Sequence, residues 1–166
     1  MIELETLAKI PLFYDVNSEA LAYLQPRFKQ LLVNKGTVII KENTEGDQIY
    51  ILVKGIVQVT KDLVKGFDED QLLTEKVLAK LSADSLPTFG ENGVLGNGTR
   101  MANIIALSDC ELYTLSKADF DNFAEYNYQA GYIVMKNMAR KLSESLKDTD
   151  ENLVKLATAL YIAVQG

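Results

Sequence analysis

The sequence predicts a mainly β fold with α-helices at both ends. Between residues 31 and 115 the apolar residues recur with a period of two, which is the period of a strand with one buried face. Gly36, Gly46 and Gly55 punctuate this region, and short strands with turn signals at such intervals indicate a sandwich or a barrel. Before and after it the period is that of a helix. The 166 residues therefore predict one β domain with helical segments, divided into residues 1–30, 31–115 and 116–166.

Residues 1–30 form the predicted N-terminal helical segment. Asn17 and Ser18 are favoured residues at a helix start, and Glu19 places a negative charge in the first turn. The apolar residues that follow recur at spacings of three and four, at Leu21, Leu24 and Phe28. We therefore expect a short helix with one apolar stripe.

The predicted strands lie between residues 31 and 115. They cover residues 38–40, 49–53, 56–59, 77–81, 102–106 and 111–115. Residues 61–75 are polar and charged, and we expect an exposed hairpin loop there. Cys110 is the only cysteine and lies in an apolar stretch, which predicts a small buried hydrophobic residue.

Residues 116–166 are predicted to form two helices. The first begins at about Ser116, and the second runs from about Tyr132 to the end of the chain. Residues 148–151 are its weakest stretch, because aspartate is a poor helix former. The apolar residues of the second helix fall in two heptad series, which are Leu142, Thr149, Leu156 and Ala163, and Leu146, Leu153 and Leu160. Such series predict a dimer seam, which we favour, or a helix that folds back on the β domain.

The composition excludes several classes of function. Histidine is absent and only one cysteine is present, which excludes Ser-His-Asp and Cys-His catalysis, the usual zinc sites and an intrachain disulfide. We therefore expect neither an enzyme, nor a metal site, nor a cofactor. The net charge of −6 and the lack of a Lys/Arg cluster argue against nucleic-acid binding. The acidic start and the lack of a long apolar run predict neither a signal peptide nor a membrane span, which favours the cytoplasm.

Residues 89–102 are the most informative stretch of the chain. They hold four glycines within nine positions, at residues 90, 93, 96 and 98. Glycine lets the backbone approach a ligand closely, and exposed backbone N–H groups attract anions. Glu91 and Arg100 stand nine residues apart across these glycines. A guanidinium fits a phosphate and a carboxylate accepts hydrogen bonds from hydroxyls, so this stretch predicts a site for a ligand with an anion and a sugar.

The strand pattern and this stretch together resemble the cyclic nucleotide-binding domain family. The first signature of that family runs here from Gly36 through the apolar residues 38–40, Gly46-Asp47 and the alternating residues 49–51 to Gly55. The second signature is the phosphate-binding cassette, which opens Phe-Gly-Glu at residue 89 and ends Arg-x-Ala at residue 102. The chain is similar to stand-alone bacterial domains and to the sensor domains of catabolite activator proteins and protein kinase A regulatory subunits.

The resemblance implies a jelly-roll β-barrel, also called a double-stranded β-helix, with the cassette at residues 89–102. Arg100 would pair with the cyclic phosphate and Glu91 would accept from the ribose 2′-hydroxyl. The ligand-binding residues implied are Phe89, Gly90, Glu91, Asn92, Gly93, Arg100, Met101 and Ala102. The long C-terminal helix would close over the base as a lid.

Two functions are compatible with this resemblance. The first is a regulatory module that binds cAMP or cGMP and couples binding to movement of the C-terminal helices, in a homodimer formed by the last helix. The alternative is a degenerate domain that acts as a dimerising or protein-interaction module without tight nucleotide binding. Met101 stands where a small residue is usual and Asn92 where a hydrophobic one is usual, and both departures favour the alternative.

Overall fold

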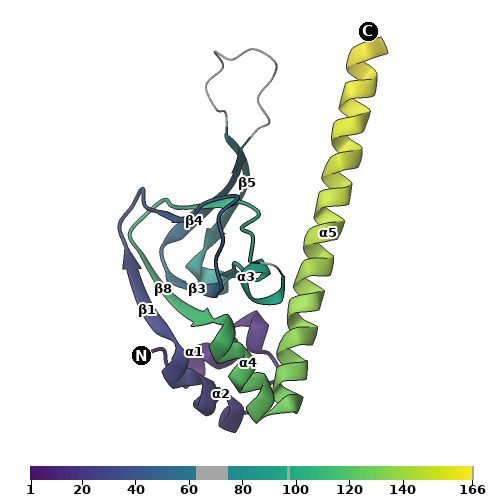
Figure 1. Ribbon diagram of the computed structural model, residues 1–166. Helices are drawn as coiled ribbons and strands as arrows, with labels where there is room; N and C mark the ends of the chain where they lie inside the picture. The colour runs from purple at the N-terminus through teal and green to yellow at the C-terminus, as the bar shows by residue number, and fades with distance from the viewer. Residues whose placement is uncertain (63–74, 97, 166) are drawn as a thin grey trace.

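The computed structural model describes residues 1–62, 75–96 and 98–165, and it shows a helical base, two β-sheets above it and a long helix alongside (Figure 1). Before the sheets, the elements of the base are α1 (Leu4–Lys9), η1 (Pro11–Phe13), α2 (Ser18–Leu24) and η2 (Gln25–Arg27). Asn17 caps α2 as predicted, because its side-chain oxygen accepts a hydrogen bond of 2.8 Å from the Ala20 N–H. The predicted apolar stripe is buried, although α2 ends at Leu24 and Phe28 follows η2 in extended backbone.

Two four-stranded antiparallel sheets stand on this base. Their strands are β1 (Lys29–Val33), β2 (Val38–Ile40), β3 (Gln48–Lys54), β4 (Ile56–Asp62), β5 (Glu75–Ser82), β6 (Thr88–Phe89), β7 (Asn103–Ala106) and β8 (Cys110–Ser116). One sheet has the order β1-β8-β3-β6 and the other has the order β2-β7-β4-β5. The predicted β region with helices on both sides is confirmed, although the 38-residue helix α5 makes the described helical residues more numerous than the strand residues. The described strands pair as two four-stranded sheets, and the closure of these sheets into a jelly-roll barrel stays a prediction.

The hairpin formed by β4 and β5 is longer than the sequence pattern predicts. The register pairs Thr60 with Val77 and ends with Asp62 opposite Glu75. Thr60 is fully buried and its hydroxyl donates a 2.8 Å hydrogen bond to the Glu75 carboxylate. This polar contact extends the ladder into residues that we expected to form a loop. The remainder of the predicted loop, residues 63–74, lies outside the described residues.

Strand β3 separates two hydrophobic cores. Ile49 and Ile51 belong to the lower core, whereas Leu52 belongs to the core between the sheets and Tyr50 packs against it. Successive side chains of a strand point to opposite faces, so the alternation of β3 supplies both cores. The lower core combines residues from the helices before and after the sheets. Its fully buried members include Leu7, Ile10, Phe13, Leu24, Phe123, Val134 and Met138. Cys110 is buried in the upper core, as predicted.

The chain ends in two helices, α4 (Lys117–Tyr126) and α5 (Tyr128–Gln165). Ser116 caps α4 by accepting a 3.1 Å hydrogen bond from the Asp119 N–H. α5 starts four residues earlier than expected, because the side chain of Asn127 accepts a 3.0 Å hydrogen bond from the Ala130 N–H and supplies a cap. The expected weak stretch, residues 148–151, is helical throughout. α5 is therefore one continuous helix of 38 residues.

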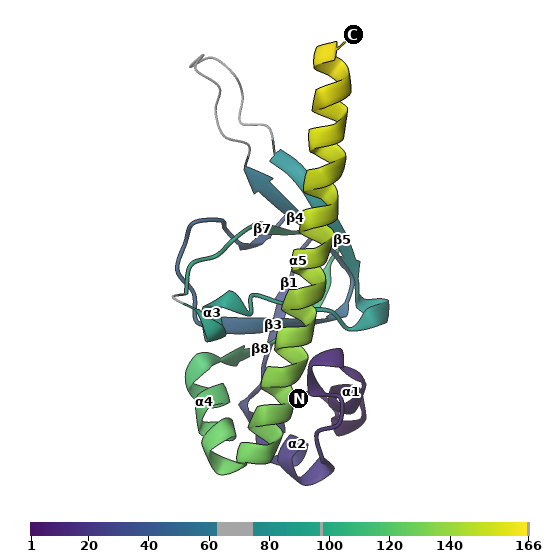
Figure 2. The same cartoon turned by 90° about the vertical axis from the view of Figure 1, so that its right-hand side faces the viewer.

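The lower part of α5 packs on the base, and its upper part extends beyond the sheets (Figures 1 and 2). Asn137 ties the lower part to the start of the chain, since its side-chain amide donates to the carbonyls of Leu12 and Tyr14 at 3.1 and 2.9 Å. The leucines of the heptad series are exposed by 62–64% at positions 146, 153, 156 and 160. The alternative in which these leucines fold back on the β domain is therefore not what the structure shows.

Candidate functional site

The glycine-rich stretch leaves β6, turns through the short helix α3 (Asn92–Leu95) and returns to β7. Gly90 and Gly98 have φ values of +86° and +84°, a region of backbone conformation that favours glycine. Val94 is buried in the lower core and anchors α3. The backbone of Arg100 is fixed on the other side, because its N–H donates to the Thr44 carbonyl at 2.8 Å and its carbonyl accepts from the Asn43 N–H at 2.9 Å.

Arg100 is a buried arginine with a fixed orientation. Only 5% of its surface is exposed, and its Nη1 donates to the carbonyl oxygens of Gln48 at 3.0 Å and Gly90 at 2.9 Å. No acidic side chain among the described residues forms an ion pair with it. A buried cation whose side chain donates these hydrogen bonds to neutral carbonyl oxygens remains available to an anionic partner.

Three glycines make room for the Arg100 guanidinium. A Cβ atom on Gly46 would lie 2.4 Å from Nη2, and one on Gly90 or Gly93 would lie 2.7 Å from Nη1. No real Cβ atom stands so close to another heavy atom, so these positions require glycine while Arg100 lies there. Gly93 and Gly90 were predicted as site residues, but Gly46 was interpreted only as a turn residue. Gly46 makes room for Arg100, a residue far away in the sequence, and the spacing of the glycines does not indicate such a contact.

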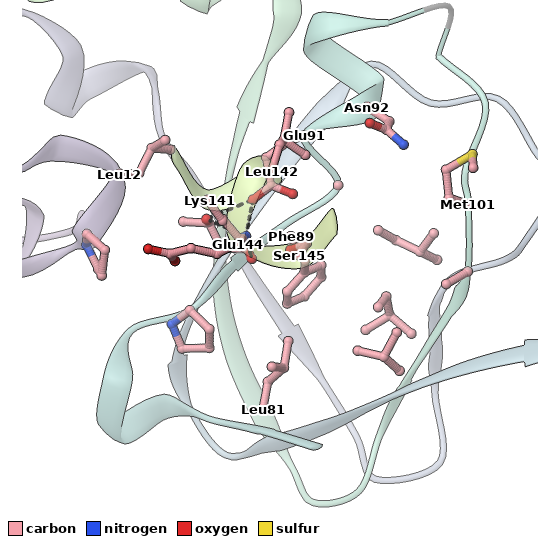
Figure 3. A pocket seen from close by; sticks show the side chains of 18 of the residues that line it. Leu12, Leu81, Phe89, Glu91, Asn92, Met101, Lys141, Leu142, Glu144 and Ser145 are labelled. Carbon is pink, nitrogen blue, oxygen red and sulfur yellow. Dashed lines mark hydrogen bonds and ion pairs between the residues drawn. The ribbon is translucent and has the colours of Figure 1, made fainter. Parts of the chain in front are cut away.

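Glu91 is also buried, with 8% of its surface exposed, and it has two partners. The Thr88 hydroxyl donates a 2.9 Å hydrogen bond to its Oε1, and the ammonium group of Lys141 forms an ion pair with the same oxygen (Figure 3). Lys141 also donates to the Thr88 hydroxyl at 3.1 Å and to the Thr88 carbonyl. Lys141 belongs to α5, so this cluster connects the long helix directly to the glycine-rich stretch.

Glu91 and Arg100 line one cavity of about 770 Å³ between the sheets, η1 and α5. Seven of the eight predicted site residues line it, which are Phe89, Gly90, Glu91, Asn92, Arg100, Met101 and Ala102. Gly93 does not line it and lies instead behind the guanidinium. Figure 3 shows Glu91 and Lys141 together at the centre of this view, with Leu12 on one side of them and Leu81 and Phe89 below.

The cavity combines an apolar wall with a basic lining. Four basic side chains, Lys61, Arg100, Arg140 and Lys141, face two acidic ones, Glu91 and Glu144, although the whole chain carries a net charge of −6. The apolar wall consists mainly of Ile40, Val59, Leu78, Leu81, Phe89, Met101 and Ile104. Such a lining suits an anionic ligand that also has an apolar part.

Lys141 and Thr88 were not predicted as site residues. Lys141 lies three residues after Met138 and seven after Val134, both of which are buried. It therefore continues the buried face of α5, and a charged residue on a buried face requires a partner of opposite charge. This signal was present in the sequence, but only the structure identifies Glu91 as the partner.

Two further properties of the described residues bear on the class of protein. They contain no group of three or more His, Cys, Asp or Glu side chains that could hold a metal ion. In the same part of the chain, no helix is both long and apolar enough to cross a membrane.

Comparison with known proteins identifies the family. The model of the cyclic nucleotide-binding domain matches residues 30–127. The chain belongs to the cyclic nucleotide-binding domain family. Its cavity, with an internal arginine and glutamate on one glycine-rich stretch, is thus the cavity of a cyclic nucleotide-binding domain, a ligand-binding regulatory domain.

Relatives of this cyclic nucleotide-binding domain include a kinase and a catabolite activator. The chain is 33% identical over 115 residues to the cGMP-dependent protein kinase isozyme 1 of Drosophila melanogaster, a match that covers 69% of the chain and 14% of the kinase. The catabolite activator protein of Thermus thermophilus has a TM-score of 0.73 at 26% identity, which covers 89% of this chain and 63% of that one. A cyclic nucleotide-binding domain from Methylobacillus flagellatus shares the fold with a TM-score of 0.73 at 21% identity, over 91% of this chain and 80% of that one. The chain therefore spans only a small part of the curated relative's length.

Proposed function

We propose that this domain binds cAMP or cGMP in the 770 Å³ cavity and couples binding to the position of α5. The observation that carries the proposal is that Glu91 and Arg100 are buried by more than 90% and line the same cavity. Two buried side chains of opposite charge that do not form an ion pair with each other are costly to maintain unless each has another partner.

The parts of a cyclic nucleotide fit different parts of this lining. The guanidinium of Arg100 would pair with the phosphate, and the carboxylate of Glu91 would accept from the ribose 2′-hydroxyl. The base would lie against the apolar wall that includes Leu81 and Phe89. Both cAMP and cGMP carry the same ribose and phosphate, so these two charged residues recognise what the nucleotides share. The choice between the nucleotides depends on the groups around the base.

Lys141 provides the proposed coupling between the ligand and α5. It forms an ion pair with Glu91, the carboxylate that a ribose would use. A ribose hydroxyl that bonds to Glu91 changes the interaction of Glu91 with Lys141 and therefore changes the free energy of the present position of α5. A ligand shifts a conformational equilibrium only through such a difference in affinity between two states.

Isothermal titration calorimetry with cAMP and with cGMP tests the proposal. We expect binding of at least one nucleotide, and we expect Arg100→Ala to weaken it by roughly tenfold to a hundredfold, since a hydrogen bond to a charged group contributes about 1.5–3 kcal/mol. Lys80→Ala removes an exposed positive charge on β5 and serves as the matched control, with unchanged affinity. Absence of heat with either nucleotide at millimolar concentration would reject the proposal.

A second function, dimerisation without tight nucleotide binding, is favoured by two observations. Met101 is 57% exposed at the cavity wall, and the heptad leucines of α5 are exposed. The occupant that we propose for this seam is a second copy of the chain, because the heptad series is continuous from Leu142 to Ala163. Light scattering combined with a thermal shift assay separates the two functions. If the chain is a dimer and its melting temperature does not rise when cyclic nucleotide is added, the second function is supported.

A further inference from the structure

Tyr50 lies on β3, an inner strand of its sheet, near the guanidinium of Arg100. Its backbone pairs with Phe89 of β6 on one side and with Thr114 of β8 on the other, so the strand is held along both edges. Its ring stacks on the ring of Phe89, with centroids 5.5 Å apart and an angle of 7° between the planes. Tyr50 therefore presents a fixed aromatic face.

Arg100 lies between this aromatic face and the main cavity. Its Cζ is 5.7 Å from the centroid of the Tyr50 ring, which is within the range of a cation–π contact. Arg100 also borders a second, smaller cavity of about 140 Å³, which Tyr50, Gln48 and Gly46 help to line. Tyr50 lines this smaller cavity and not the main one, so a ligand in the main cavity does not touch it.

The smaller cavity gives the guanidinium a place into which it can retract. The two carbonyls that hold Arg100 both bind its Nη1, and they leave the rest of the group to be held by packing. The Tyr50 ring supplies that packing on the side away from the main cavity, and its attraction to the cation favours a single orientation. A smaller aliphatic side chain at position 50 would enlarge the smaller cavity and remove this attraction.

We propose that Tyr50 is a positioning residue, which holds Arg100 in place to pair with an anion in the main cavity. The inference rests on the proposed function, since the anion is the phosphate of a cyclic nucleotide. Tyr50 contributes through the face of its ring. Its hydroxyl has no hydrogen-bond partner among the described residues, so phenylalanine at this position retains the relevant group.

The test is a double-mutant cycle in the full chain, with the affinity for cAMP and for cGMP measured by calorimetry. Tyr50→Leu is expected to weaken binding by about fivefold to thirtyfold, which is the range for a cation–π contact shielded from water. Tyr50→Phe is expected to change it less than about threefold. In an Arg100→Ala background, Tyr50→Leu is expected to have no further effect, because its contribution acts through the guanidinium. Adenosine and guanosine lack the phosphate, so each should bind the unmodified chain and the Tyr50→Leu chain with equal affinity.

Several results would overturn the inference. An equal loss in the wild-type and Arg100→Ala backgrounds, or an equal loss for the nucleosides, would make Tyr50 a structural residue only. If the Tyr50→Leu chain folds and its affinity for the nucleotides is unchanged, Tyr50 does not position Arg100. Tyr50→Met, whose unbranched side chain adapts to irregular space, provides a second variant should the leucine chain not fold. Failure of the proposed function is recognised separately, because the unmodified chain would then bind neither nucleotide, and the role of Tyr50 would fail with it.

Discussion

At the scale of single residues, the glycines of this domain have two different physical roles. Gly36 has a φ of +87° and open space where a Cβ atom would stand. Gly46 does not have a positive φ, but the guanidinium of Arg100 occupies the place of its missing side chain. Their spacing in the sequence makes these two glycines look equivalent. Gly36 is required by its backbone conformation. Gly46 is required because the guanidinium of Arg100 occupies the space that a side chain would take.

This difference predicts that two similar substitutions change different properties, one the affinity for the ligand and the other the stability of the fold. Gly46→Ala should displace Arg100 and weaken cyclic nucleotide binding by at least tenfold, comparable to the loss of one charged hydrogen bond. Gly36→Ala should lower the free energy of unfolding by about 1–2 kcal/mol through its left-handed backbone, with unchanged affinity. Calorimetry and chemical denaturation of both variants provide the comparison. Normal affinity in Gly46→Ala would show that Arg100 is not held where the structure has it.

Lys141 allows a second prediction at this scale. Lys141→Met removes the ion pair with Glu91 and keeps most of the side-chain volume, so α5 should open more often. A partly exposed ion pair contributes roughly 0.5–1 kcal/mol, which corresponds to amide exchange about two to five times faster around residue 141. Lys136→Met, on the exposed side of the same helix, is the matched control. Equal exchange in the two variants would contradict a tether at Lys141.

The extent to which the sequence predicts the site follows from how local each contact is. Glu91, Arg100 and the glycines between them lie on one short stretch, so their types and spacing indicate an anion and a sugar site. Gln48 and Lys141 reach the same place from β3 and α5. A contact between segments so far apart depends on strand order and helix direction, which periodicity does not determine.

At the scale of elements, the junction of α4 and α5 determines where Lys141 lies. A Cβ atom on Gly131 would lie 2.8 Å from the Cβ of Ala124, so the two helices approach as closely as glycine permits. The cap at Asn127 fixes the start of α5 at the same junction. The direction of the long helix is thus set by small residues and one cap at its first turn.

Gly131→Ala tests this junction. In an isolated helix the change would stabilise by about 1 kcal/mol, but here the added methyl group should force α4 and α5 apart and lower the free energy of unfolding by about 1–3 kcal/mol. Ala124→Gly in the same chain restores the space and should recover part of the loss. Denaturation curves of the single and double variants measure both effects. A stabilising Gly131→Ala would mean that the helices are not in close contact.

Helix α5 also shows how element prediction from sequence succeeds and fails. The heptad pattern predicts the helix correctly, because a 3.6-residue period over many turns is a strong signal. Residues 148–151, the predicted weak stretch, do not interrupt the helix, and Lys147 forms an i,i+4 ion pair with Glu151 at 3.9 Å. Low propensity of a few residues is a weak preference in a long helix with good formers on either side.

At the scale of the whole molecule, the two proposed activities occupy different parts of α5. Every residue that lines the main cavity lies between Pro11 and Ser145. Most of the exposed heptad leucines come after that point, from Leu146 to Leu160. The lower part of the helix therefore lines the main cavity, where we propose the ligand site, and the upper part carries the proposed seam.

A chain that ends after residue 146 separates these activities. We expect it to fold, because the buried core residues all precede this point, and to bind cyclic nucleotide within about threefold of the full chain. It should be monomeric, whereas we expect dimers of the full chain, and sedimentation measures the difference. A substitution of Leu153 by aspartate in the full chain provides the control without truncation. Dimers of the shortened chain would place the seam elsewhere.

The hydrogen bonds from Asn137 to the carbonyls of Leu12 and Tyr14 have a mechanical consequence. They fasten the first turns of the protein to the same helix that carries Lys141, one turn away. A displacement of α5 must therefore either break these two hydrogen bonds or move the N-terminal segment that contains Leu12 and Tyr14 together with the helix. Under the proposed coupling, a fluorophore near the amino terminus would therefore report on nucleotide occupancy, although it lies at the far end of the sequence from α5.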